Sequence, residues 1–420
     1  MINHEYKNLY YEDSVKKQLI ITHDGGQITN AELYSEGFSL KESLCSESML
    51  LFGSCEASEL KLQIANTGNS LKDKWLVVTE KLNGQSTQFR FGKYKVYSDT
   101  PNADRNYRNI VAYDLMYDVI NTDVAEWYNN LTFPMTIKEF RNSFFNHVGI
   151  TQESVTLIND SVSIEKTITS TSISGKEIIT SICELNGVFG HINRDDNFEY
   201  ISLDSSKTPS EINTSLVMSG EYEDFLTDKI TKLQIRQEEN DIGVVYGDGE
   251  NCYIIEGNFL VYGKDTEELT RICQKLYQKI SNITYRPCKC KIKGNPCNTV
   301  GDFLSIKTRK MDIQTFILER TLNGIQLLTD SMESKGTLEY KEDVNSIHKN
   351  ILQLKGKTNV LERTIELTRS ELTNTETKLR SEIEQSAESI KLEVKGLSVG
   401  AVNILRNSQT LNFEEYYFPE

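Results

Sequence analysis

Alternating apolar and polar residues fill the first hundred positions and predict short β-strands. In the stretch ELKLQIA (59–65), leucine and isoleucine alternate strictly with charged or amide residues, as expected for a strand with one buried face. Turn compositions at residues 24–26 (DGG) and 83–84 (NG) each separate two further extended runs. Short strands divided by regular turns are typical of a small barrel or sandwich.

Beyond the first hundred residues the pattern mixes strands with helices. The chain is extended at first and turns helical near Tyr113, and residues 135–150 then place their apolar side chains on one helical stripe. A second helix is expected to begin after a Ser174 cap and to end at Gly187. A hairpin that turns at residues 194–197 should follow it.

The next part of the chain is again rich in strand patterns, interrupted by one predicted helix over residues 265–282. Because this helix lies between two strand-rich blocks, we expect it to be inserted in a second β-domain or to lie at its edge. The predicted fold class is therefore α+β, with two antiparallel β-domains, α+β material between them and a C-terminal coiled coil. The predicted limits are 1–106 for the first β-domain, 107–225 for the α+β domain, 226–340 for the second β-domain, 341–396 for the coiled coil, and 397–420 for a linker to a missing or truncated C-terminal module.

A narrow apolar stripe with a seven-residue repeat begins after Asp343, which suits a helix N-cap. The stripe is too thin to form a core of its own, so we expect the helix to pack against copies of itself; a long helix lying on its own domain is the alternative. Thr358, Thr368 and Thr375 weaken the repeat, and beyond Leu379 the spacing approaches an eleven-residue period. The predicted oligomerisation seam consists of Val344, Ile347, Ile351, Leu354, Leu361, Ile365, Leu372, Leu379, Ile383, Ile390 and Val394.

Charge narrows the range of partners. The chain has 46 basic and 61 acidic residues and a formal net charge of −15, which argues against nucleic acid or an anionic membrane as the main partner. No run approaches 18 consecutive apolar residues, and the first residues lack the apolar segment of a signal peptide. We therefore expect a soluble protein made in the cytosol. Its eight cysteines are scattered, which favours free and mostly buried thiols over a disulfide framework.

Candidate chemistry is sparse. Cys288, Cys290 and Cys297 are the best candidates for metal ligands, but no fourth ligand lies at a suitable spacing, so buried thiols are the preferred interpretation. The segment HINRDD, from His191 to Asp196, contains possible acid, base or calcium-binding groups, yet its composition favours a hairpin tip. We predict no catalytic, cofactor-binding or metal-binding residue and no enzymatic activity.

Five segments in this order resemble the N-terminal hub region of phage tail tip proteins, the tail-associated lysin or prophage endopeptidase tail family. The segments are 50–64, 107–120, 182–203, 240–260 and 301–336. The resemblance implies that the two β-domains are similar to tail tube subunits, so that three chains would match a sixfold tube. It implies a trimeric baseplate hub that closes the distal end of the tail tube and connects it to a fibre or spike for host attachment and genome ejection.

The resemblance also implies a set of partners. These are two further copies of the chain, the distal tail protein, the tail tube ring, the tape measure protein and a downstream fibre or receptor-binding module, with DNA only in transit through the lumen. The protein would be made in the cytoplasm of a bacterial host and would reside in the virion, without a cofactor. Three alternatives stay open: a hub-associated peptidoglycan hydrolase, a receptor-binding fibre protein, and the hub of a phage-tail-like bacteriocin. The early seam residues mildly favour two strands, so the coiled coil alone leaves dimer and trimer open.

Overall fold

The computed structural model describes residues 4–338 apart from 13, 86–87, 168–171 and 238–242. The predicted coiled coil (341–396), its seam from Val344 to Val394, and the linker (397–420) lie outside the described residues. They stay predictions. Among the described helices, none is long and apolar enough to cross a membrane.

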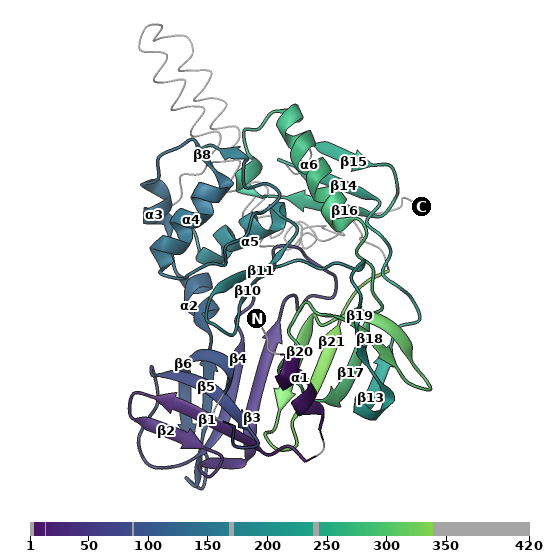
Figure 1. Ribbon diagram of the computed structural model, residues 1–420. Coiled ribbons are helices and arrows are strands. Elements are labelled where there is room, and N and C mark those ends of the chain that lie inside the picture. Colours follow the sequence, from purple (N-terminus) through teal and green to yellow (C-terminus); the bar gives the residue numbers. More distant parts are fainter. Residues whose placement is uncertain (1–3, 13, 86–87, 168–171, 238–242, 339–420) are drawn as a thin grey trace, which may run out of the picture.

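One eleven-stranded sheet joins both ends of the described chain (Figure 1). Every neighbouring pair in it is antiparallel. In sheet order the strands are β13 (Val217–Tyr222), β17 (Cys288–Lys293), β21 (Thr329–Ser334), β20 (Glu319–Asn323), β3 (Leu33–Ser43), β4 (Glu59–Ala65), β7 (Tyr107–Tyr113), β6 (Phe89–Pro101), β5 (Trp75–Leu82), β1 (Lys17–His23) and β2 (Gly26–Thr29). The β3–β20 pair, with Leu40 opposite Leu322, connects the strands from the beginning of the chain to those from its end. The two β-rich regions of the sequence therefore share one sheet.

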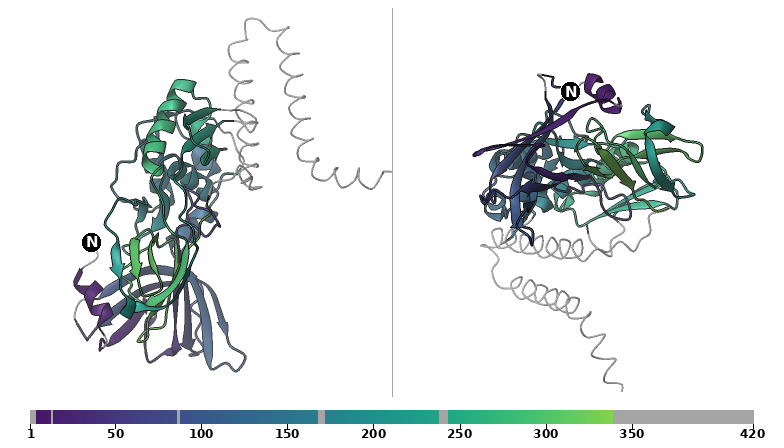
Figure 2. Two further views of the ribbon diagram at one scale, coloured as in Figure 1. Left: turned by 90° about the vertical axis from the view of Figure 1, so that its right-hand side faces the viewer. Right: turned by 90° about the horizontal axis from the view of Figure 1, so that it is seen from below.

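A second part of the molecule combines helices with small sheets and lies at one end of the large sheet (Figures 1 and 2). Its helices are α2 (Leu115–Asn121), α3 (Ala125–Asn129), α4 (Ile137–Val148), α5 (Gly175–Leu185) and α6 (Thr266–Ile280), with short 3-10 turns η1 (Thr214–Leu216) and η2 (Phe259–Val261). Its strands are β8 (Met135–Thr136) with β9 (Ser163–Ile164), β10 (Phe189–Ile192) with β11 (Phe198–Ile201), and β15 (Val244–Gly247), β14 (Lys232–Arg236) and β16 (Cys252–Glu256). A further sheet contains β12 (Ser210–Ile212), β18 (Phe303–Lys307) and β19 (Asp312–Phe316), and helix α1 (His4–Tyr11) packs on the large sheet.

Local sequence signals account for the ends of the main helices. Thr136 and Ser174 each accept a hydrogen bond from the backbone three residues later and complete capping boxes at α4 and α5. Asp265 caps α6 in the same way. Gly149 ends α4 with φ of +71°, a conformation that glycine adopts without strain. The predictions of these three helices and of the hairpin after α5 are confirmed.

Helix α6 packs against β14 and β15, beside α4 and α5, rather than on the large sheet (Figure 1). The strands that follow it along the chain, β17, β20 and β21, lie in the large sheet. The described part is therefore mixed α+β with mostly antiparallel sheets, as the sequence predicts. The finer domain limits stay a prediction.

Two separate apolar cores hold the described residues together. The lower core lies under β1 and β3–β7, is covered by Tyr6 and Tyr10 of α1, and includes Leu322 and Leu328 from the end of the chain. The upper core contains the buried side chains of α2–α6, of the small sheets, and of β17 and Met332 in the large sheet. The opposite face of the large sheet is half-buried to exposed and mixes lysine, serine, threonine and amide side chains with aromatic and aliphatic ones such as Trp75, Val77, Tyr97 and Tyr113.

Candidate functional site

Charged side chains interrupt the buried face of the large sheet at one level. On the neighbouring strands β3, β20 and β21, the inward positions read apolar, charged, apolar, and the charged residues are Glu42, Arg320 and Asp330. Their exposed fractions are 2%, 0% and 0%. Each charged residue has one apolar neighbour in the lower core and one in the upper core, both two positions away along the chain. In the order lower core, upper core, these neighbours are Leu40 and Leu44 for Glu42, Leu322 and Leu318 for Arg320, and Leu328 and Met332 for Asp330.

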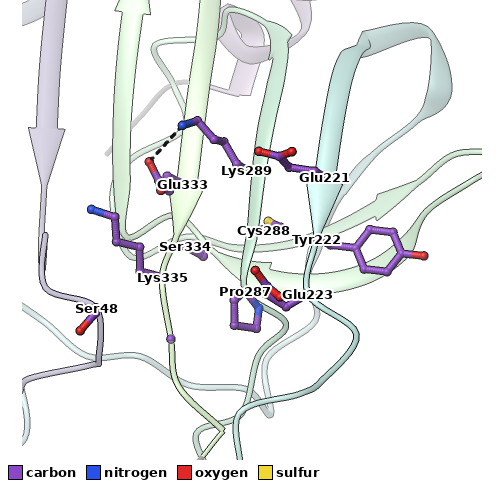
Figure 3. A pocket seen from close by; sticks show the side chains of 11 residues that line it. Ser48, Glu221, Tyr222, Glu223, Pro287, Cys288, Lys289, Glu333, Ser334 and Lys335 are labelled. Atoms are coloured by element: carbon purple, nitrogen blue, oxygen red, sulfur yellow. Dashed lines mark ion pairs between the residues drawn. The ribbon is translucent and has the colours of Figure 1, made fainter.

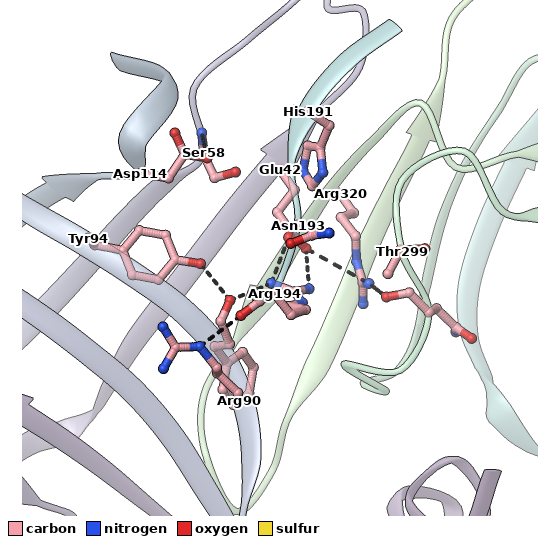
Figure 4. A network of polar contacts seen from close by, with 12 residues as sticks. Glu42, Ser58, Arg90, Tyr94, Asp114, His191, Asn193, Arg194, Thr299 and Arg320 are labelled. Carbon is pink, nitrogen blue, oxygen red and sulfur yellow. Dashed lines mark hydrogen bonds and ion pairs between the residues drawn. The ribbon is translucent and has the colours of Figure 1, made fainter. Parts of the chain in front are cut away.

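The same arrangement continues where β7 leads into α2. Asp114 is buried between Ala112 of the lower core and Met116 of the upper core. Its carboxylate accepts hydrogen bonds from the backbone nitrogens of Ser58 and Met116, both at 3.0 Å. Burial raises the pKa of the Asp114 carboxyl to about 6, although these hydrogen bonds oppose the rise. We call the group formed by Glu42, Asp114, Arg320, Arg194 and His191 (Figure 4), together with Asp330, which pairs with Arg320, the polar belt.

Arg320 is fully enclosed within the polar belt. Its guanidinium forms an ion pair with Asp330 and donates to the backbone oxygens of Asn295 (3.0 Å) and Asn298. It also lies 3.9 Å from Glu42, directly across the β3–β20 junction. A buried charge is tolerated when it is paired and its remaining donors are hydrogen-bonded, and Arg320 meets both conditions.

The tip of the β10–β11 hairpin connects the upper part to this network. Nη1 and Nη2 of Arg194 lie 2.7 and 2.8 Å from the two carboxylate oxygens of Glu42, and Nη1 also donates to the Phe91 backbone oxygen at 3.0 Å. In return, Arg90 of β6 donates to the Arg194 backbone oxygen at 2.9 Å and forms an ion pair with Asp196. Burial raises the pKa of the Glu42 carboxyl, but Arg194 and Arg320 outweigh it and hold that pKa below its ordinary value. The tip is therefore fixed to the sheet by reciprocal charged contacts.

His191 lies directly behind this tip. Its Nδ1 is 2.9 Å from Glu199 of β11, while its buried Nε2 has no hydrogen-bond partner among the described residues. Burial lowers the pKa of His191, but the hydrogen bond to Glu199 and the charges of Glu199, Glu42 and Asp114 outweigh burial and raise the pKa above its ordinary value. The polar belt thus contains two groups, His191 and Asp114, whose pKa values are both raised above their ordinary values.

A second feature lies at one edge of the large sheet. Within the described residues β13 and β2 are its edge strands, and β13 exposes Met218 (57%) and Tyr222 (41%). A groove of about 490 Å³ runs beside β13 (Figure 3) and is lined by residues of β13, β17 and β21. Lys289 and Glu333 lie across it, 3.9 Å apart. Such an edge presents backbone groups that another strand can pair with.

The remaining candidates from the sequence are placed as follows. Cys288 and Cys290 are buried in the upper core, whereas Cys297 belongs to the lower core, so the three thiols do not converge. Among the described residues, no group of three or more histidine, cysteine, aspartate or glutamate side chains is arranged to hold a metal ion. The interpretation of residues 191–196 as part of a hairpin with its tip is confirmed, and Asp196 pairs with Arg90 there.

The meeting of these charged residues in the polar belt was not predicted from the sequence. A signal was present, because alternation puts Glu42 on the same side of its strand as Leu40 and Leu44, and it puts Asp330 on the same side as its apolar neighbours. That parity indicates a buried charge in each strand. It does not reveal which charges meet. Asp330 pairs with Arg320 of the neighbouring strand, whereas the partners of Glu42, which are Arg194 and Arg320, lie more than a hundred residues away along the chain.

Comparisons with known proteins find similarity only at the level of three-dimensional structure. No protein-family model matches the chain, and no curated protein matches it. Among solved structures, the 43 kDa tail protein of prophage MuSo2 from Shewanella oneidensis aligns with a TM-score of 0.49 and 12% identity over 76% of this chain and 96% of that one. The tail protein from Neisseria meningitidis MC58 aligns with a TM-score of 0.48 and 10% identity over the same shares. The prophage tail protein gp18 from Listeria monocytogenes EGD-e aligns with a TM-score of 0.43 and 13% identity over 80% of this chain and 98% of that one.

Proposed function

We propose that this chain is a structural protein of a phage tail tip: a trimeric baseplate hub that closes the distal end of the tail tube and connects it to a fibre or spike. The observation that carries the proposal is the open eleven-stranded sheet, to which both ends of the described chain contribute and which leaves two strands, β2 and β13, at its edges. The five segments that resemble tail tip hubs, in the same order, support it.

An open sheet with two accessible edges suits assembly into a ring. If β13 of one copy pairs with β2 of the next, the contact is head-to-tail, and repeated head-to-tail contacts close into a ring when the rotation permits. The exposed Met218 and Tyr222 would be covered in such a contact. Three copies would agree with the resemblance, whereas the predicted seam from Val344 to Val394 by itself leaves dimer and trimer open.

The ring would work as a plug and an adaptor. The tail tube ring, the distal tail protein and the tape measure protein would contact it from the tail side, and a fibre or receptor-binding module would follow the predicted coiled coil. The accessible face of the large sheet, which carries lysine, serine, threonine and amide side chains beside aromatic and aliphatic ones, would line the passage for DNA during genome ejection. The protein would then reside in the virion.

The mass of the full chain in solution tests the proposal. We expect a particle of three times the 48.0 kDa chain by light scattering with size-exclusion chromatography. Met218→Lys combined with Tyr222→Lys should shift the particle toward the single chain, because lysines on an edge strand oppose pairing with another strand. Leu327→Lys is the matched control, since Leu327 is also an exposed apolar residue (80%) but lies away from β13.

The predicted coiled coil needs a separate variant. Leu361→Asp combined with Ile365→Asp places charges in the seam and should weaken the trimer without changing amide hydrogen exchange in the strands of the large sheet. A single-chain mass for the unchanged protein in concentrated solution would contradict the trimeric hub.

A further inference from the structure

We propose that the polar belt is a parting plane: the upper and lower cores can open relative to each other along it while each keeps its own packing. In this arrangement the strands that cross the plane act as a hinge, and the tip of the β10–β11 hairpin acts as a latch. The proposal concerns the internal mechanics of the chain. It does not depend on the function proposed above.

The apolar packing is interrupted at the level of the polar belt. Leucines on both sides of Glu42 are buried, yet Leu40 packs in the lower core and Leu44 in the upper core. The same division holds around Arg320 and Asp330 on the two adjacent strands. Apolar contacts on the inner face of these strands therefore do not run continuously through this level. Cooperativity between two parts of a protein depends on such contacts, so the belt is the level at which cooperativity is weakest.

Ion pairs and hydrogen bonds hold the plane closed on the side of the hairpin. On the hairpin side these contacts are the Arg194–Glu42 pair, the Arg90–Asp196 pair, and the donation from Arg90 to the Arg194 backbone oxygen. When the plane opens, each of these groups can exchange its partner for water, whereas apolar side chains cannot. Opening here exposes charged and polar groups rather than the interior of either core.

The chain crosses the plane within the large sheet, whereas the hairpin tip only reaches the plane from the upper part. The β3, β20 and β21 backbones pass through the level of the belt within the large sheet, as does the chain from β7 into α2 at Asp114. These crossings keep the two parts joined on the sheet side. The hairpin tip reaches the inner face from the upper part and is not one of those strands (Figure 4). Release of the tip would let the parts open around the sheet.

The tip itself is rigid enough to act as a latch. Asn193 accepts hydrogen bonds from the backbone nitrogens of Asp195 (3.0 Å) and Asn197 (3.1 Å), which fix the turn. Its own side-chain nitrogen donates to Glu153 at 2.7 Å. The turn therefore presents Arg194 and Asp196 to the sheet as one unit. We expect both contacts to open together.

Amide hydrogen exchange on the purified full chain tests the parting plane. In the unchanged protein we expect amides of the lower core, in β4 to β6, and of the upper core, in α4 to α6, to exchange through two distinct openings. The variant Arg90→Gln with Asp196→Asn cuts the latch at a partly exposed pair and so should fold. It should speed exchange roughly tenfold or more in residues 189–201, with little change inside α6. Glu267→Gln, which cuts the exposed pair of Glu267 with Arg271 within α6 and so touches only the upper part, is the matched control and should leave exchange in the hairpin unchanged.

A second variant makes the opposite change. Glu42→Leu, Arg194→Met, Arg320→Met and Asp330→Leu together replace the charges by apolar side chains of similar volume and would join the two cores into one. We expect the separate openings to merge into one in this variant. A single common opening in the unchanged protein would overturn the proposal. Unchanged hairpin exchange in the latch variant would overturn it as well, whether or not the fourfold variant folds.

Discussion

The lower and upper cores are built by different rules. The lower core comes from antiparallel strands in which every second residue is buried, as in Trp75–Leu82, where buried and half-buried positions alternate without exception. The upper core comes from capped amphipathic helices and from short strands such as β10, in which all four residues are buried. The two meet at charged side chains rather than at shared apolar residues. The described part of the chain therefore contains two packing units, and the boundary between them crosses the large sheet.

Removal of one charge from the polar belt should lower the free energy of unfolding most. Arg320→Met leaves Asp330 buried without its cation, while Glu42 keeps its pair with Arg194, and we expect the free energy of unfolding to fall by about 3–5 kcal/mol. Urea denaturation followed by circular dichroism measures it. Arg271→Met removes an arginine from an exposed pair with Glu267 and should change that free energy by less than about 1 kcal/mol. If both variants lost the same free energy of unfolding, the buried ion pair of Arg320 would stabilise the chain no more than the exposed pair of Arg271.

A cavity in the lower core should give the next largest fall in the free energy of unfolding. Leu62 is buried in the lower core, and Leu62→Ala should cost about 2–5 kcal/mol of unfolding free energy. If the cores are separate units, amide exchange should accelerate in β4 to β7 far more than in α5 and α6. Gln63→Ala changes the next residue, on the accessible face of the same strand, and should stay within about 0.5 kcal/mol.

Lower pH should stabilise the chain between about pH 8 and pH 6. The pKa of His191 is raised by Glu199, Glu42 and Asp114 against the effect of burial, and burial raises the pKa of Glu80 to about 7 and that of Asp114 to about 6. For all three groups the folded state binds the proton more tightly than the unfolded chain, so stability is lost as pH rises through the folded pKa values. We expect a difference of about 1–3 kcal/mol between pH 6 and pH 8 in urea denaturation.

Glu80→Gln separates the contribution of the lower core from that of the polar belt. Tyr10 donates to Glu80 at 2.6 Å, and a glutamine can still accept this hydrogen bond. The variant should lose part of the pH dependence, and His191→Gln should lose another part. A stability that rises from pH 6 to pH 8 in the unchanged protein would contradict both assignments.

The smallest expected effect concerns a helix cap in the upper core. Ser174 accepts a hydrogen bond from the Glu177 backbone nitrogen at 3.2 Å, and Ser174→Ala should cost about 1 kcal/mol. Ser174→Asp keeps an oxygen at the cap and should restore most of the loss. If the upper core is its own unit, the change should appear in the exchange of α5 and not in that of β5.

Much of the fold follows from local patterns. Period-two alternation predicts the strand at Glu59–Ala65, and cap residues such as Ser174 and Asp265 predict where the helices begin. These predictions succeed because propensity, capping and alternation act over a few neighbouring residues. Strand order is different, since nothing near Leu40 indicates that its neighbour in the sheet is Leu322.

The candidate site was predictable only in fragments. The hairpin between β10 and β11 was expected from its turn composition, and its contact with the large sheet was not. Glu42 and Asp330 carry a local signal of burial, and Arg194 carries none because it lies in a polar turn. The polar belt exists because pairing of β3 with β20 brings residues 42 and 320 to one level.

Alternation and capping signals are enough to predict the α+β character, strands such as β4 with their inward side, and the starts of helices α4 to α6, because backbone geometry links neighbouring residues to these properties. That both ends of the described chain share one sheet, that two cores form, and that buried charges lie between them became visible only in the folded chain. Those features depend on contacts between residues far apart along the chain, and such contacts leave no periodic trace in the sequence.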